Sequence, residues 1–165
     1  MRQVASDGNF TTRRRGLGID TMTALQILIN LCKKFEGCRL AAYKDGGGVL
    51  TIGYGHTGVD VHLGLVWTQA ECDAALVMDA QHALNAALRV SPVLKGATPG
   101  QQASIADFVY NLGVNGYANH SVKPLVDAQR WHSAAVEIKL FCHDAGKVEP
   151  GLVARRLAES NLLVG

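Results

Sequence analysis

The segment from Phe35 to His56 constrains the fold of this chain most, because it combines a helix end, two short strands and a glycine turn. One apolar helical face leads up to it, formed at three- and four-residue steps by Met22, Leu25, Ile29, Cys32 and Phe35. Gly37 then supplies a helix stop. The pattern therefore predicts that Glu36 lies at a helix C-terminus.

A hairpin is expected directly after this helix. Residues 40–43 read as a strand, Gly46-Gly47-Gly48 as a turn and residues 49–56 as the returning strand. Alternation along the second strand puts Thr51 on one face and Ile52, Tyr54 and His56 on the other. We expect Ile52 and Tyr54 to pack inward while Thr51 faces a cleft.

Two carboxylates in this segment have different surroundings. Glu36 lies beside helix carbonyl ends that disfavour a negative charge, so partial burial there would keep it protonated. Asp45 lies at the mouth of the glycine turn, where it should be hydrated and ionised. An acid and a carboxylate of this kind are the minimum for hydrolysis of a glycosidic bond.

Composition narrows the class of protein. A chain of 165 residues suits one domain or two small lobes, and 48% hydrophobic residues allow a sizeable core. A net charge of +2 is too small to imply nucleic acid but is compatible with a mildly acidic wall polymer. The four cysteines have no disulfide-scaffold or metal-ligand spacing, so buried reduced thiols are expected.

The first 18 residues contain three consecutive arginines and no apolar signal core. We interpret residues 1–18 as a basic extension, a solvated tail rather than a patch for an anionic membrane or wall. No targeting segment or membrane span is predicted. The chain is therefore expected to be made in the cytoplasm and to need another factor to reach a wall substrate.

The remaining chain reads as helices with clear start signals. Thr68 and Glu71 form a capping box before a long helix that runs to about Arg89. Asp79 lies beside the apolar stripe of that helix, within reach of His56 from the sheet. A second cap at Thr98 starts a largely apolar helix to about Leu112, which belongs at the centre of a lobe.

Two motifs resemble one known family. Glu-Gly-x-Arg-Leu-x-x-Tyr-x-Asp followed by Thr-Ile-Gly-x-Gly-His is similar to the active-site segment of the phage-type lysozymes, the endolysins of glycoside hydrolase family 24. Near the C-terminus, Gly-Lys-Val-x-Pro-Gly-Leu-Val-x-Arg-Arg-x-Ala-Glu resembles the second motif of that family, and Pro150 would start the last helix. The resemblance covers roughly residues 20 to 163.

The resemblance implies a helix-rich α+β, lysozyme-like fold. A small antiparallel sheet lobe and a helical lobe would be joined by a long helix, with a cleft between them. We expect a catalytic domain over residues 19–165. Within it, the sheet lobe spans about residues 37–67, the linking helix 68–89 and the helical lobe 90–165.

The resemblance also implies roles for individual residues. It makes Glu36 the general acid, Asp45 the group that orients water and stabilises oxocarbenium charge, and Thr51 a holder of that water. It makes His56 and Asp79 a structural pair. Substrate contacts are expected from Thr57, Tyr110, Asn111, Ser121 and Arg155.

The expected function is that of an endolysin, which hydrolyses the β-1,4 bond after N-acetylmuramic acid in bacterial peptidoglycan for host lysis. The protein is expected to be a monomer that acts without a metal or cofactor and without nucleic acid or stable membrane insertion. Two other classes stay open: a glycan-binding module without turnover, and a lytic transglycosylase. The intact Glu36, Asp45 and Thr51 argue against the first, and Asp45 with Thr51 argues against the second, which needs no water.

Overall fold

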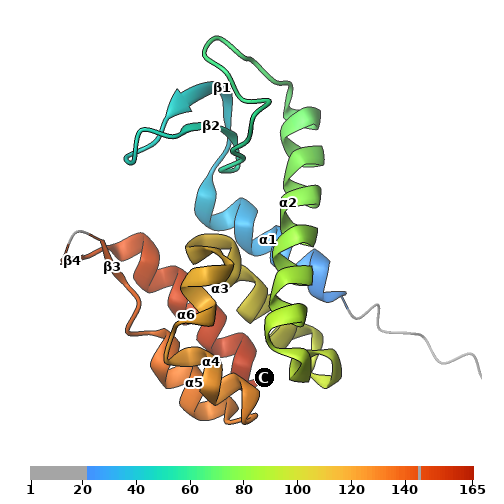
Figure 1. The fold of residues 1–165 in the computed structure, drawn as a ribbon, viewed down its shortest axis with the longest axis vertical. Coiled ribbons are helices and arrows are strands. Elements are labelled where there is room, and N and C mark those ends of the chain that lie inside the picture. The colour runs from blue at the N-terminus through green and yellow to red at the C-terminus, as the bar shows by residue number, and fades with distance from the viewer. Residues whose placement is uncertain (1–21, 145) are drawn as a thin grey trace, which may run out of the picture.

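The computed structural model describes residues 22–144 and 146–165, so the expected basic extension over residues 1–18 lies outside them. The described part begins with a helix, a two-stranded hairpin and a long helix, and continues with shorter helices and a second small hairpin (Figure 1). In order, the elements are α1 (Ala24–Glu36), β1 (Arg39–Lys44), β2 (Leu50–Gly53), α2 (Gln69–Val90), the 3-10 helix η1 (Pro92–Gly96), α3 (Pro99–Ala118), α4 (Val122–Asp127), α5 (Trp131–Ile138), β3 (His143–Asp144), β4 (Lys147–Val148) and α6 (Pro150–Val164).

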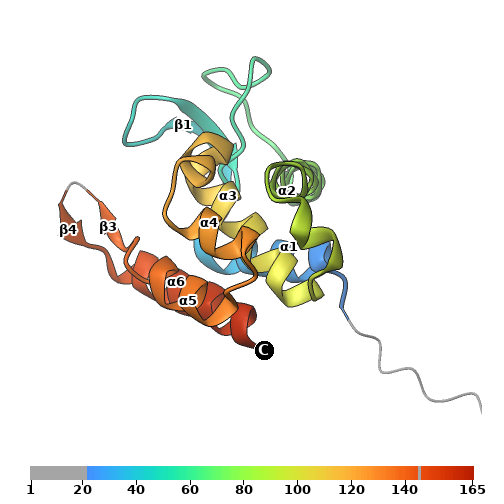
Figure 2. The same cartoon turned by 60° about the horizontal axis from the view of Figure 1, so that its bottom comes forward.

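The predicted α+β class is confirmed. Strands β1 and β2 pair antiparallel, with Tyr43 opposite Thr51, and α2 runs from this hairpin to the helices at the other end of the molecule (Figure 1). Helix α3 packs against α1, α2 and α6, and α5 lies along α6 (Figure 2). The exact boundaries of the lobes stay a prediction.

Local signals set most helix ends. Thr68 and Thr98 each accept a hydrogen bond from the third helical residue, and Glu71 and Gln101 complete the two predicted capping boxes. Helix α1 ends at Glu36 as predicted, followed by Gly37 at φ +67°. Helix α6 begins at Pro150 as predicted.

The second strand is shorter than expected. It ends at Gly53 instead of His56, because Gly53 and Gly55 both adopt positive φ and turn the chain back on itself. Ile52 and His56 then exchange two backbone hydrogen bonds of 2.9 Å across this tight turn. Residues 57–67 form a loop that touches β1 through one bridge between Ala41 and Val66.

Helix α3 is longer than expected. The sequence predicted an end near Leu112, but helical turns resume beyond Gly113 and continue to Ala118. Gly113, at φ 75° and ψ 160°, makes a kink instead of a stop. The kink follows Tyr110 and Asn111, so it changes the direction of the helix just past the residues that face the cavity described below.

The core runs through both ends of the molecule. Its fully buried large side chains include Leu28 of α1, Leu76 of α2, and Ile105 and Phe108 of α3. Among the described residues, no helix is both long enough and apolar enough to cross a membrane.

Candidate active site

One cavity of about 300 Å³ brings together side chains from the end of α1, the β1–β2 hairpin and α3. Its lining consists of Glu36, Tyr43, Asp45, Thr51, Gly55, Thr57, Tyr110 and Asn111. Glu36, Asp45 and Thr51, which the sequence singled out, therefore face the same space. The elements that carry these side chains, α1, the β1–β2 hairpin and α3, lie where the sheet end of the molecule meets its helical end (Figure 1).

Glu36 projects from the last turn of α1, with its side chain 24% exposed. Its Oε1 accepts a hydrogen bond from Nη1 of Arg155 on α6. Its Oε2 points toward Gly55, where an added Cβ would lie 3.9 Å away. One oxygen is thus held by a cation while the other faces the cavity.

Asp45 begins the turn between β1 and β2 and is exposed. Its Oδ1 accepts hydrogen bonds from the backbone N–H groups of Gly47, at 2.9 Å, and Val49, at 2.8 Å. These bonds order the glycine turn and fix the carboxylate at the cavity edge. Among the described residues, Oδ2 has no hydrogen-bond donor, so it is available to a water or a substrate.

Thr51 lies on β2 and is 4% exposed. Its hydroxyl donates to the carbonyl oxygen of Val49 at 3.1 Å, which leaves the lone pairs of Oγ1 to accept a further hydrogen bond. Tyr43, its cross-strand partner, also lines the cavity, and the guanidinium of Arg39 lies 4.2 Å from the Tyr43 ring.

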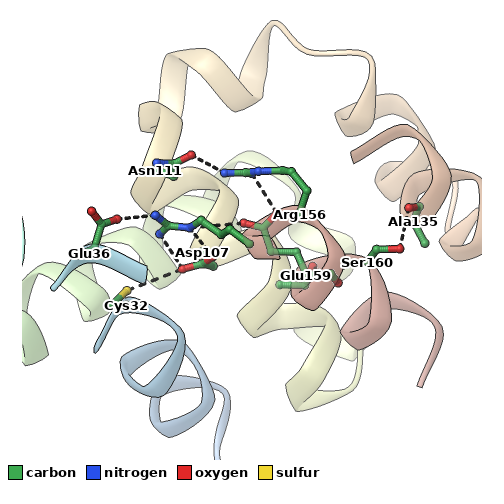
Figure 3. A network of polar contacts seen from close by, with 10 residues as sticks. Cys32, Glu36, Asp107, Asn111, Ala135, Arg156, Glu159 and Ser160 are labelled. Atoms are coloured by element: carbon green, nitrogen blue, oxygen red, sulfur yellow. Dashed lines mark hydrogen bonds and ion pairs between the residues drawn. The ribbon is translucent and has the colours of Figure 1, made fainter. Parts of the chain in front are cut away.

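Glu36 is bonded to a buried network of ion pairs and hydrogen bonds (Figure 3). Asp107 of α3 is fully buried and accepts two hydrogen bonds from Arg155, from Nε at 2.8 Å and from Nη2 at 2.9 Å. Burial by itself would lower the pKa of Arg155, but the hydrogen bonds and charges of Asp107 and Glu36 raise it. Arg155 therefore stays a cation although its side chain is only 3% exposed.

A second buried pair continues the network. Arg156 donates to Oδ1 of Asn111, and its Nη1 lies 2.9 Å from Oε2 of Glu159. Its guanidinium also lies 4.7 Å from the Phe108 ring. Because Glu159 is fully buried, desolvation raises its pKa well above the usual value and favours the neutral acid. The hydrogen bond from Arg156 thereby fixes the side chain of Asn111, which lines the cavity.

Neighbouring cavities extend the space at both ends. A cavity of about 490 Å³ shares Glu36 and Asn111 with the first and continues toward β3 and the start of α6. Another of about 300 Å³ shares Gly55, Thr57 and Tyr110 and continues toward His82 on α2. Their shared lining residues place the three cavities side by side, and this row of cavities is called the groove below. An elongated row suits an extended polymer better than a small molecule.

The other predicted contact residues are placed as follows. Thr57 and Tyr110 line the cavity, and the Tyr110 hydroxyl donates to the backbone oxygen of Tyr54 at 2.8 Å. Arg155 lies behind Glu36 and reaches the neighbouring cavity. Ser121 is not among the lining residues; it is exposed, and its hydroxyl donates to Oε1 of Glu137 at 2.6 Å. The structure therefore separates Ser121 from the other residues of this group.

Three residues of the site, Tyr43, Gly55 and Asp107, are not predicted from the sequence. Tyr43 and Gly55 occur inside the first family motif, but the pattern gives them no role. Asp107 had a detectable signal, because it is the one charged residue within the apolar run 103–112. The described residues contain no group of three or more His, Cys, Asp or Glu side chains arranged to hold a metal ion.

The chain is similar to known proteins over most of its length. The phage lysozyme family model matches residues 33–159, which include all of the cavity-lining side chains. The chain is 32% identical over 128 residues to a SAR-endolysin of bacteriophage PS119, covering 77% of this chain and 75% of that one.

Two solved structures are similar. One is the muramidase domain of SpmX from Asticaccaulis excentricus, at 27% identity and a TM-score of 0.74, covering 84% of this chain and 95% of that chain. The other is a P22 lysozyme mutant, at 27% identity and a TM-score of 0.66, covering 87% and 99%. The family model spans more than half of the length of this chain. The chain therefore belongs to the phage lysozyme family and is a lysozyme of the endolysin type.

Proposed function

We propose that this lysozyme hydrolyses the β-1,4 bond between N-acetylmuramic acid and N-acetylglucosamine in peptidoglycan, with inversion at the anomeric carbon. The observation that carries the proposal is the shared cavity of Glu36, Asp45 and Thr51. Two carboxyl groups and a hydroxyl around one space are the groups that a direct attack by water requires.

Glu36 is the general acid that protonates the leaving oxygen. Its Oε2 faces the cavity while Arg155 holds Oε1, so the side chain is fixed with one oxygen directed at the substrate. Fixing a catalytic group in one rotamer saves the entropy of orienting it in the transition state.

Asp45 orients the attacking water and stabilises oxocarbenium charge. The turn hydrogen bonds occupy Oδ1 and leave Oδ2 for this task. Thr51 contributes a second contact to the same water, since its hydroxyl hydrogen is directed to Val49 and its lone pairs can accept a hydrogen bond from water.

The sugars on both sides of the cleaved bond lie along the groove. Thr57, Tyr110 and Asn111 supply contacts in the central cavity, and Arg155 acts through Glu36. Ser121 has no place in this scheme, since it bonds Glu137 instead of lining the groove. The protein works as a monomer without metal, cofactor or nucleic acid.

The test is mass spectrometry of peptidoglycan digested by the purified protein. Hydrolysis predicts muropeptides that end in a reducing N-acetylmuramic acid and contain the elements of one added water. An anhydro-sugar end, which lacks that water, would instead identify a lytic transglycosylase. Unchanged peptidoglycan, with the protein bound to it, would identify a glycan-binding module.

The site of action follows from the substrate. The enzyme is made in the host cytoplasm and reaches the wall from the periplasmic side through a membrane lesion that another protein makes. Expression in a host should therefore leave cells intact until the inner membrane is permeabilised, for example with chloroform. Lysis on expression alone, without permeabilisation, would show that the chain reaches the wall without a separate lesion.

A further inference from the structure

Glu36 is placed in an apparent conflict. A general acid must keep its proton until the bond breaks, yet Oε1 of Glu36 accepts a hydrogen bond from a guanidinium. A cation in direct contact favours the charged carboxylate. Something else in the network has to reduce the effect of that cation.

Asp107 has the geometry to do so. It is fully buried, and it pairs with Arg155 through two hydrogen bonds of 2.8 and 2.9 Å along the Nε–Nη2 edge of the guanidinium. This edge-on pairing leaves Nη1 as the donor that points at Glu36. Asp107 therefore orients the guanidinium of Arg155 and compensates its positive charge.

Other groups around Glu36 do not take this role. Within α1 and α3, burial raises the pKa of Cys32 and of Tyr110, so both stay neutral. Glu159 lies 3.9 Å from Nε of Arg155 without a hydrogen bond to it, and burial favours its neutral form. The remaining titratable groups near Glu36 are Arg156 on α6 and, in the groove itself, Tyr43, Asp45, His143, Asp144 and Glu149.

We propose that Asp107 is a positioning residue for the lysozyme reaction, which orients and neutralises Arg155 so that Glu36 can hold its proton. The inference rests on the proposed function, in which Glu36 is the general acid. Asp107 touches no substrate and acts through Arg155. Its removal would leave an uncompensated cation against Glu36 and favour the carboxylate form of the acid.

The first test is the pH dependence of an Asp107→Asn variant, which keeps the shape of the side chain and removes its charge. The alkaline limb of the kcat profile should move to lower pH by about one unit, with little change in KM. The matched control is Glu159→Gln, which replaces a second buried carboxyl group beside the same arginine, one that burial keeps neutral, and should leave the limb in place. A variant of Asp107 that only lowers the melting temperature, with an unmoved limb, would overturn the proposal.

The second test does not depend on turnover. Titration of the Glu36 side-chain carboxyl by ¹³C NMR should show a lower midpoint in Asp107→Asn than in the wild type. In an Arg155→Gln background the same substitution should cause no further shift, because its effect passes through Arg155. An equal shift in both backgrounds would contradict that route.

The two proposals fail in different ways. If Glu36→Gln stays active but the NMR midpoint moves in Asp107→Asn, the network is right and the assignment of the acid is wrong. If Glu36→Gln is inactive and the midpoint does not move, Asp107 is only structural. Should Asp107→Asn fail to fold, the wild type still provides a test: the Arg155 Nε–H should resist hydrogen exchange when Glu36 is protonated, because Asp107 still holds it. Loss of that protection would overturn the proposal.

Discussion

Nδ1 of His56, in the turn after β2, lies 2.8 Å from Oδ2 of Asp79 on the long helix α2. Nε2 of the same ring lies 3.3 Å from Oδ2 of Asp60. Burial of the ring opposes its protonation, but the hydrogen bonds and charges of Asp79 and Asp60 together raise the pKa of His56 above its usual value. The pair joins the hairpin to the helix that the sequence predicted it would meet.

Replacing Asp79 with Asn should destabilise the protein most under mildly acidic conditions. A raised histidine pKa contributes stability that is complete below the unfolded pKa and is lost as pH rises through the folded pKa. The loss at pH 5.5 should be about 1 kcal/mol and should shrink by pH 9, measured by denaturant unfolding. Asp60→Asn serves as control and should cost less, because the Asp60 side chain is 60% exposed. Equal losses at both pH values for Asp79→Asn would argue against the ion pair.

Replacing Glu36 with Gln should abolish wall clearing while the fold survives. The amide keeps the shape and can still accept a hydrogen bond from Arg155, but it has no proton to give to the leaving oxygen. Activity should fall by at least about 100-fold, with an unchanged circular dichroism spectrum. Clearance at the wild-type rate would show that the acid has been assigned wrongly.

Asp45 and Thr51 should differ in their sensitivity to conservative change. Asp45→Asn loses the charge that stabilises the transition state, so activity should fall by about 100-fold. Thr51→Ser keeps a hydroxyl and should lose at most about tenfold in activity, the value of a single hydrogen bond.

NMR of the first-formed reducing sugar checks the mechanism, since inversion of a β bond gives the α-anomer first. Early appearance of the β-anomer would point to retention, which needs carboxyls roughly 5–5.5 Å apart instead of roughly 6.5–9.5 Å.

A methyl group at Gly55 should harm both folding and activity. The residue has φ +93°, which strains any L side chain, and the new Cβ would lie 3.9 Å from Oε2 of Glu36. We expect Gly55→Ala to cost about 1–2 kcal/mol in stability and to lower activity, because the added methyl group would take up space in the cavity that Gly55 lines. Gly96→Ala is the matched control, because Gly96 has no positive φ and open space around its Cα. Equal activity of the two variants would remove Gly55 from the site.

Reductant should leave the melting temperature unchanged, because all four cysteines are free thiols. Cys32 and Cys72 are buried, and burial raises the pKa of Cys72 to about 11. In the native protein at pH 8, Cys72 should therefore resist iodoacetamide, since the thiolate is the reactive form. Partly exposed Cys142 serves as the internal comparison and should be alkylated first, as read by peptide mass spectrometry. A drop in melting temperature on reduction would reveal a disulfide.

The sequence by itself determined the features whose causes are local. Hydrogen bonds between residues three apart cap the start of α2 at Thr68 and of α3 at Thr98, and Pro150 begins α6. Each of these helix starts therefore depends on a few neighbouring residues. The end of α1 at Glu36 and the glycine turn beside Asp45 are equally local. The family resemblance carried by the motif from Glu36 to His56 and by the C-terminal motif implied the fold class and the roles of Glu36, Asp45 and Thr51.

Only the tertiary structure decided how the acid is supported. Arg155 reaches Glu36 across 119 residues of sequence and Asp107 across 48, and no periodicity relates such distant positions. The kink at Gly113 also has a tertiary context: α3 resumes beyond a residue that locally favours a stop, and the resumed turns bury Tyr117 against the Phe108 ring. Asp107 stood out in the sequence as a charge in an apolar helix, but a buried carboxylate needs a partner, and only folding brings Arg155 close enough to be that partner.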